Sequence, residues 1–257
     1  MWDDQSPHQF RGSMMPPMFT SRLYEGDNFI FEHCRQSAVE VLPQAFLMYS
    51  ISIKVNGPSN VEVWCGEKRS RLTLTRGDMT IAPYRFSIDG AQIESCEFLQ
   101  LYLNPAVVDR AANELGNPAV IVPVLGAVDP LAEQTIYQLE EELTSGRGTR
   151  EYVDLLIETL ATHLVKYYAE DTWTVKNVGG FPTYLLERTH EYINGNLDRN
   201  LSVEEIARAL GIEADRFVRA FRASTGKSIH LYLDERRVEE KRMRLTPTAY
   251  RGSDEIK

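Results

Sequence analysis

The spacing of the apolar residues changes once along this chain, near Asn104-Pro105, and this change limits what the chain can fold into. Between residues 46 and 103 the spacing is two, with turn residues such as Asn56-Gly57-Pro58 between the apolar runs. That spacing is typical of strands, whereas the three- and four-residue spacing downstream is typical of helices. The sequence therefore predicts an α+β chain that begins with a small barrel or sandwich. The alternating residues are Tyr49, Ile51, Ile53 and Val55, then Val61, Val63 and Cys65, then Leu72 and Leu74, and finally Leu99, Leu101 and Leu103.

Two amphipathic helices are predicted after the strands, over residues 131–143 and 153–168. The second has an apolar stripe that runs from Val153 through Leu160 to Tyr168. Two interpretations stay open, because such a pair can pack on its own strands or form a dimer face, and both can hold.

The two ends of this first part differ in composition from the rest. Residues 1–20 mix Asp, Gln, Pro and Met without the basic start and apolar run of a secretory signal, which predicts a flexible arm in a cytoplasmic protein. Residues 171–180 are polar and end in Gly179-Gly180, which predicts an interdomain linker. The three cysteines form no CxxC pair, so we expect reduced thiols.

The net charge of −9 is unevenly distributed along the chain. Residues 1–180 hold 14 Lys+Arg against 24 Asp+Glu, whereas residues 181–245 hold 12 against 11. A locally basic region in an acidic protein suits a nucleic-acid partner that is bound selectively.

Two short helices are predicted within that region. Ser202 caps the first and Glu205 completes a capping box, while Gly211 ends it. The second spans residues 214–223 and ends at Gly226. Two helices joined by a Gly-containing turn, with the small Ala207 at their crossing, are typical of a helix-turn-helix.

The outward face of the second helix carries the residues expected to contact DNA in the major groove. Asp215, Val218 and Arg219 are predicted to contact bases, with Arg219 donating to guanine, Asp215 accepting from cytosine and Val218 touching a thymine methyl. Phosphate contacts are predicted for three other basic residues. These are Arg216, Arg222 and Lys227. The alternative is that this Arg-rich face is an ordinary solvated surface.

Residues 201–240, LSVEEIARALGIEADRFVRAFRASTGKSIHLYLDERRVEE, resemble the first helix-turn-helix and connecting helix of AraC/XylS-family transcription regulators. RGDMTIAP at residues 76–83 and LQLYLNP at residues 99–105 are similar to the cupin-type effector domain of that family. The resemblance implies a cupin-like β-barrel with a helical pair over residues 21–170, which senses a small-molecule effector and dimerises. It implies an AraC-type domain over residues 181–257 that binds double-stranded DNA, with RNA polymerase as a further candidate partner.

The chain departs from the family pattern in two places. Family members carry a second helix-turn-helix where this sequence reaches residues 253–257, and Pro247 breaks the connecting helix before it. We therefore expect a truncated DNA-binding domain, through artificial shortening, a frameshift or a naturally short protein. The recognition helix also begins at Glu213 where Ser or Thr is usual.

A barrel of this kind can be an enzyme, a sensor or a plain scaffold. Metal-binding cupins need converging histidines, and residues 46–103 contain none, so we expect no metal, no cofactor and no catalysis. The pocket candidates are side chains expected to point inward, although the same side chains suit a plain core. They are Tyr49, Ile51, Trp64, Tyr84, Phe86 and Tyr102. Two functions remain open: a ligand-modulated DNA-binding regulator, or a ligand-binding and dimerising module whose DNA-binding half is incomplete.

Overall fold

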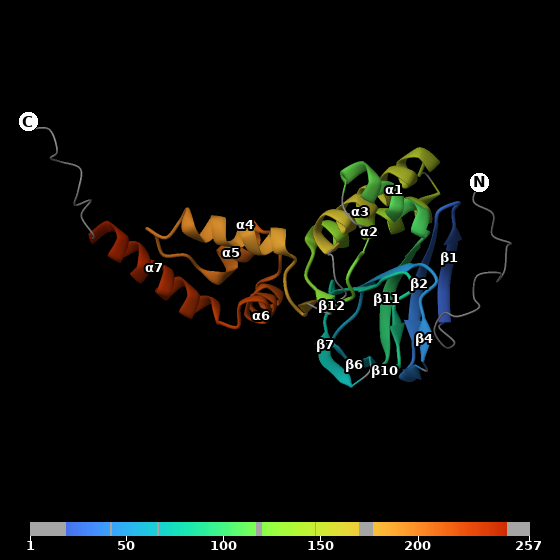
Figure 1. Ribbon diagram of the computed structural model, residues 1–257, viewed down its shortest axis with the longest axis horizontal. Helices are drawn as coiled ribbons and strands as arrows, with labels where there is room; N and C mark the ends of the chain where they lie inside the picture. The colour runs from blue at the N-terminus through green and yellow to red at the C-terminus, as the bar shows by residue number, and fades with distance from the viewer. Residues whose placement is uncertain are drawn as a thin grey trace, which may run out of the picture.

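The computed structural model describes residues 19–41, 43–65, 67–116, 120–146, 148–169 and 177–245. In the described residues the N-terminal half holds strands and three helices, and the C-terminal half holds four helices. Figure 1 shows these two halves. This confirms the predicted α+β class. None of the helices in the described ranges has the length and apolar character needed to cross a membrane.

A seven-stranded sheet forms the larger wall of the N-terminal half, in the order β1-β2-β11-β5-β8-β12-β13. Its neighbours are antiparallel except β12 and β13, which pair in parallel. Central strand β11 places Phe98 opposite Lys54 on β5 and Cys96 opposite Gln36 on β2. The strands are β1 (Phe19–Glu25), β2 (Phe29–Gln36), β5 (Tyr49–Lys54), β8 (Met79–Ala82), β11 (Cys96–Leu103), β12 (Val124–Ala127) and β13 (Asn177–Val178).

A four-stranded sheet in the order β3-β10-β6-β7 and the pair β4-β9 make up the other strands. These strands are β3 (Val39–Val41), β4 (Gln44–Ala45), β6 (Ser59–Cys65), β7 (Lys68–Leu74), β9 (Ser87–Ile88) and β10 (Gly90–Ile93). The expected cupin-like β-barrel is corrected in one respect, because the described strands hydrogen-bond in separate sheets and do not close into one. The turn predicted at residues 56–58 is where the chain passes from β5 to β6, between these sheets, and residues 76–78 connect the sheets again, from β7 to β8.

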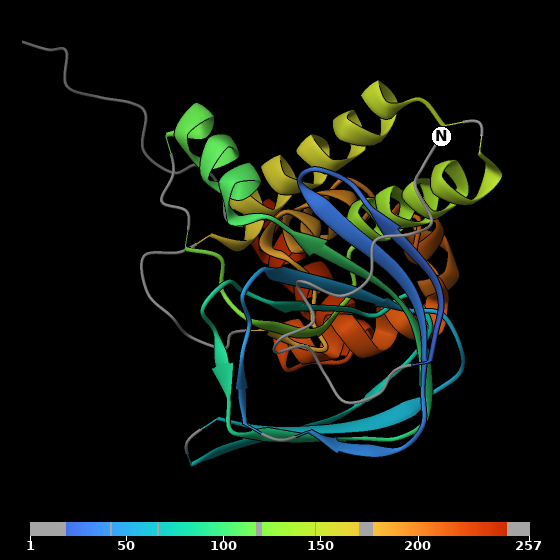
Figure 2. The same ribbon diagram turned by 90° about the vertical axis from the view of Figure 1, so that its right-hand side faces the viewer.

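Three helices, α1 (Pro105–Leu115), α2 (Pro130–Ser145) and α3 (Arg150–Tyr168), pack together on one side of the strands (Figure 2). Each begins at a side-chain cap, since Asn104, Asp129 and Thr149 accept hydrogen bonds from backbone N–H groups of the first turn. The two helices predicted from the sequence are thus confirmed as α2 and α3.

The apolar stripe of α3 packs on its own domain. Val153, Leu160 and Tyr168 are buried in the main core cluster, together with residues of β5 and β11. Leu155 is the most exposed apolar side chain of α3, at 58%. The predicted dimer stays a prediction.

The predicted linker and arm each contribute residues to a strand. Asn177 and Val178, inside the predicted linker, pair with β12, and Phe19-Thr20 of the predicted arm begin β1. Residues 1–18 and 170–176 lie outside the described ranges. Asp129 joins the two halves, because its carboxylate accepts hydrogen bonds from His163 of α3 at 2.7 Å and from the Tyr184 hydroxyl of the C-terminal half at 2.8 Å.

The C-terminal half consists of α4 (Thr183–Asn194), α5 (Val203–Ala209), α6 (Ala214–Thr225) and α7 (Ile229–Leu245). The Ser202 hydroxyl accepts from the Glu205 N–H at 3.1 Å, which confirms the predicted cap of α5. Gly211 and Gly226 have φ of +72° and +73° and end the two short helices as predicted. Pro247 and residues 253–257 lie outside the described ranges.

Candidate functional site

Helix α6 has one buried face and one polar face. Phe217, Ala220 and Phe221 are fully buried in the core of the C-terminal half, and Ala207 of α5 lies in the same cluster. This burial fixes the rotation of α6, so the residues between the buried positions point away from α5. The two predicted helices are confirmed, and Ala207 is buried between them as expected.

Four of the six predicted DNA contacts are exposed. Asp215, Val218 and Arg222 lie on the outer face of α6, with Val218 39% exposed. Lys227, just beyond the helix, pairs with Glu235 of α7 at 2.6 Å. Their predicted roles stay predictions.

Arg219 lies against the N-terminal half. Its guanidinium donates to both carboxylate oxygens of Asp78, at 2.9 and 3.2 Å, and to the Thr75 hydroxyl at 2.5 Å. Asp78 is 1% exposed and also accepts from the Thr75 N–H at 2.8 Å. Arg219 is thus held in a two-point contact typical of an arginine and a carboxylate.

Arg216 makes a parallel contact one helical turn earlier. It donates to Glu133 of α2 at 2.9 Å, and its Nε lies 3.8 Å from Asp78. Two of its nitrogens, Nε and Nη2, are buried with no hydrogen-bond partner among the described residues. Gly77, with φ of +80°, makes room for this guanidinium, because a Cβ there would collide with it. We call the contacts of Arg216 and Arg219 with Asp78 and Glu133 the interdomain clasp.

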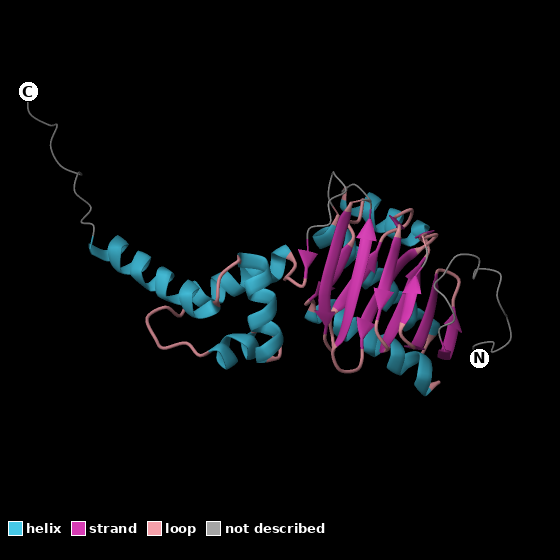
Figure 3. Cartoon of the chain, turned by 90° about the horizontal axis from the view of Figure 1, so that it is seen from below, coloured by secondary structure: helices cyan, strands magenta, loops and turns pink. Residues whose placement is uncertain are grey.

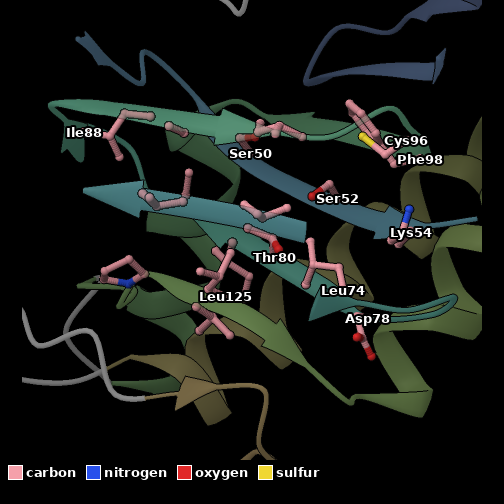
Figure 4. Close-up of a pocket in the computed structure, with 18 of the residues that line it drawn as sticks. Ser50, Ser52, Lys54, Leu74, Asp78, Thr80, Ile88, Cys96, Phe98 and Leu125 are labelled. Carbon is pink, nitrogen blue, oxygen red and sulfur yellow. The ribbon is translucent and has the colours of Figure 1, made fainter. Parts of the chain in front are cut away.

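A cavity of about 170 Å³ lies between the sheets of the N-terminal half (Figure 4). Most of its wall is apolar, whereas β5 contributes only polar side chains. The apolar wall includes Phe46, Val61, Val63, Leu74, Phe86, Ile88, Ala91, Ile93 and Leu125, and β5 contributes Ser50, Ser52 and Lys54. In Figure 4 the Lys54 nitrogen lies near Cys96 and Phe98, at the opposite end from Ile88.

The expected pocket residues need correction, because only Phe86 of the six lines this cavity. Tyr49 and Ile51 lie in the core with the helices, since the apolar side of β5 faces α1–α3 and its polar side faces the cavity. Tyr84 packs against that same core. Trp64 is on the opposite face of β6 from Val61 and Val63, and Tyr102 shares the side of Gln100 but lies outside the lining.

The cavity and the clasp share one backbone junction. The Gly77 N–H donates to the Lys54 carbonyl at 2.7 Å, and the Lys54 N–H donates to the Asp78 carbonyl at 3.1 Å. Asp78 also lines the cavity. A displacement of β5 at Lys54 would therefore act directly on the turn that holds Arg219.

The other reactive side chains in the described ranges have surroundings that are typical of structural residues. Cys34 and Cys96 are both buried and in the thiol form, and burial raises the pKa of Cys96. Burial alone would raise the pKa of Asp129, but hydrogen bonds from His163, Tyr168 and Tyr184 and the charge of His163 hold it below its ordinary value. The described residues contain no group of three or more His, Cys, Asp or Glu arranged to hold a metal ion.

Sequence reasoning missed Lys54, Gln36, Asp78 and Glu133. A lysine in phase with Ser50 and Ser52 was a readable signal for Lys54, since it marks one face of β5 as polar. No local signal identifies Asp78 or Glu133, because their partners lie 141 and 83 residues away.

Comparison with protein-family models finds no match, and neither does comparison with curated proteins. Among solved structures, the AraC-like transcriptional activator CuxR is 17% identical, with a TM-score of 0.31 over 86% of this chain and 85% of that one. A cupin superfamily protein from Desulfitobacterium hafniense is 12% identical, with a TM-score of 0.28 over 36% of this chain and 82% of its own. A cupin domain from Bordetella pertussis is 16% identical, with a TM-score of 0.28 over 36% and 99%. Because these values are low, the function proposed below rests on this chain's own residues.

Proposed function

We propose that this chain is a DNA-binding transcription regulator of the AraC/XylS type that its sequence resembles, with α6 as the recognition helix and an effector bound between the sheets. The outer face of α6 supports this proposal. A helix that crosses its partner closely, and whose exposed face mixes Arg with Asp and Val, presents the donors, acceptor and methyl groups that read base edges. In this proposal the protein is not an enzyme.

The interdomain clasp is the observation that carries the regulatory part of the proposal. Arg219 pairs with both oxygens of Asp78, and a guanidinium pairs with the O6 and N7 acceptors of guanine in the same two-point manner. The two partners exclude each other, because one fork of donors cannot serve both. The described conformation is therefore a closed state in this proposal, and DNA binding requires α6 to leave Asp78.

The clasp is well suited to open. Two buried nitrogens of Arg216 have no hydrogen-bond partner in the described ranges, which destabilises the closed state. In the open state, water or a DNA phosphate would accept hydrogen bonds from them. Effector binding near Lys54 would shift the balance between closed and open states through the backbone junction at Gly77 and Asp78.

The alternative is a ligand-binding and dimerising module in which α6 has no DNA partner. One observation favours it: both arginines of the clasp already have intramolecular carboxylate partners. In that case the clasp is a permanent interdomain contact.

A selection experiment distinguishes the two functions. The full chain is used to select duplexes from a random-sequence pool, and its affinity is then measured for the selected and a scrambled duplex at about 150 mM salt. Arg219→Ala should reduce the discrimination between the selected and scrambled duplexes by about 1–3 kcal/mol, because the loss of the clasp raises the open fraction for both duplexes alike. Arg222→Ala should weaken binding to both duplexes and reduce the salt slope by about 1.

Arg110→Ala is the matched control, because it removes the same charge from an exposed pair with Glu158 on the N-terminal helices. It should leave both affinities unchanged. Failure to enrich any sequence, or equal discrimination between the two duplexes by Arg219→Ala and Arg110→Ala, would favour the alternative function. Dimerisation and contact with RNA polymerase stay predictions of the family resemblance.

A further inference from the structure

Lys54 places a buried positive charge at one end of the cavity. Its residue is 3% exposed, and its ammonium donates to Asn56 Oδ1 at 2.6 Å and Ser59 Oγ at 2.8 Å, both neutral acceptors. No carboxylate in the described ranges lies within ion-pair distance of it. Burial lowers the pKa of Lys54, against the opposing influence of Cys96, Asp78 and Glu97. A buried cation is costly unless an anion pairs with it.

The carboxylates of Asp78 and Glu97, near Lys54, already form ion pairs with other residues. Asp78 pairs with Arg219 at 2.9 Å, and Glu97 pairs with His33 at 3.0 Å and Arg35 at 3.2 Å. Lys54 is therefore the cation in this region whose counter-charge the described chain does not supply.

Gln36, at the same end of the cavity, is a buried amide without a hydrogen-bond partner among the described residues. It is 3% exposed and lines the cavity, and neither its Nε2 nor its Oε1 has a hydrogen-bond partner among the described residues. Gln36 lies opposite Cys96 on one side of β11, and Lys54 lies opposite Phe98 on the other. Because native proteins rarely leave buried amides unpaired, this side chain points to a missing acceptor.

The remainder of the cavity suits an apolar group. Val61, Val63, Leu74, Ile88 and Leu125 line it away from Lys54. Its volume of about 170 Å³ is close to the roughly 150 Å³ of an apolar cavity that holds a benzene-sized molecule. An occupant would thus have an apolar body about the size of one six-membered ring.

We propose that the cavity binds a small organic monoanion, with a carboxylate that accepts hydrogen bonds from Lys54 and Gln36 and a ring-sized apolar body against the opposite walls. This rests on the proposed function only in taking the cavity as the effector site. The anion supplies the missing counter-charge of Lys54, and its second oxygen supplies the acceptor for the Gln36 amide.

The test is calorimetric titration of the full chain, without DNA, with three probes of equal size. Cyclohexanecarboxylate should bind, and cyclohexanecarboxamide should bind about 10- to 100-fold more weakly because its hydrogen bonds lack the charge. Cyclohexylmethylamine should not bind. Equal binding of acid and amide overturns the proposal, and so does the absence of heat from all three at about 10 mM.

Variants separate a ligand site from a structural role. Lys54→Met and Gln36→Leu should each lower the affinity for cyclohexanecarboxylate, the first by about 10- to 100-fold. Lys241→Met, at an exposed position of α7, is the control and should leave binding unchanged. Loss of binding in the control, or none in Lys54→Met, contradicts the proposal.

Lys54→Met should also keep or raise the thermal midpoint without ligand. The substitution leaves neither former acceptor of Lys54 without a hydrogen bond. Asn56 Oδ1 still accepts from the Glu97 N–H at 3.1 Å, and the Ser59 hydroxyl still donates to the Ser95 carbonyl at 3.0 Å. If Lys54 had a structural role, its replacement would lower the thermal midpoint. That result would contradict the ligand-binding role proposed for Lys54.

The two proposals fail separately. Carboxylate binding that leaves the affinity for DNA unchanged refutes regulation while the ligand class stands. Selective DNA binding together with charge-independent ligand binding refutes the ligand class while the regulator stands.

Discussion

Replacing Asp78 by asparagine should release α6 and raise affinity for the selected duplex. Arg219 makes two charge-assisted hydrogen bonds to Asp78, at 2.9 and 3.2 Å, and an asparagine at this position would retain one neutral acceptor. Hydrogen bonds to charged groups contribute about 1.5–3 kcal/mol, so the loss of one of the two should weaken the clasp by about that amount. That difference shifts the closed-to-open ratio by a factor of about 10–150.

In the proposed function only the open fraction binds DNA, so the apparent affinity should rise by the same factor when the closed state dominates. Fluorescence anisotropy with the selected duplex measures it, and a thermal melt followed by circular dichroism checks that Asp78→Asn is folded. Asp109→Asn, an exposed position on α1, is the control with the same loss of charge. A folded Asp78→Asn protein that binds the duplex no better than wild type would refute the closed-state reasoning.

Two further substitutions test the joint between the halves. Gly77→Ala should displace the Arg216 guanidinium and strain a backbone at φ of +80°, so it should lower the thermal midpoint and raise affinity for DNA; unchanged affinity in a folded variant would count against the clasp. Asp129→Asn should lower the free energy of unfolding at pH 7 by about 3 kcal/mol, as expected for a broken buried pair. The folded pKa of Asp129 lies below its ordinary value of 3.8, so its stabilisation is present above pH 3.8 and lost as the pH falls through the folded value. Denaturant melts should therefore show a shallower acid decline for Asp129→Asn than for wild type, and parallel declines would contradict this role.

The spacing of apolar residues predicted the helices and strands well, but it did not predict which of their faces pack together. A spacing of two correctly indicated strand β5, but it could not show which of its faces borders the cavity. Both faces of β5 are covered, one by α1–α3 and the other by the second sheet, so the apolar set of Tyr49 and Ile51 packs under the helices and the polar set faces the cavity. The inward side was therefore predicted one residue out of phase.

The short C-terminal helices were predictable because their signals are local. The cap at Ser202, the stop at Gly211 and the apolar spacing around Phe217 each act within a few residues. The clasp was not predictable, since it joins Arg219 to Asp78 across 141 residues through a turn that reads only as Arg-Gly-Asp. Figure 3 shows how the strands and the C-terminal helices form separate groups, so such contacts arise only where the two groups meet.

The central claim is that α6 exchanges Asp78 for DNA, and hydrogen–deuterium exchange at residues 75–78 tests it most directly. In the described conformation the Gly77 N–H is bonded to the Lys54 carbonyl at 2.7 Å and the Asp78 N–H to the Thr75 carbonyl at 3.0 Å, in a turn held by Arg219. Adding the selected duplex to the full chain should speed exchange in this turn and slow it in α6, whereas the scrambled duplex should change neither. Exchange at residues 75–78 that stays constant or slows in the presence of the selected duplex would contradict the account.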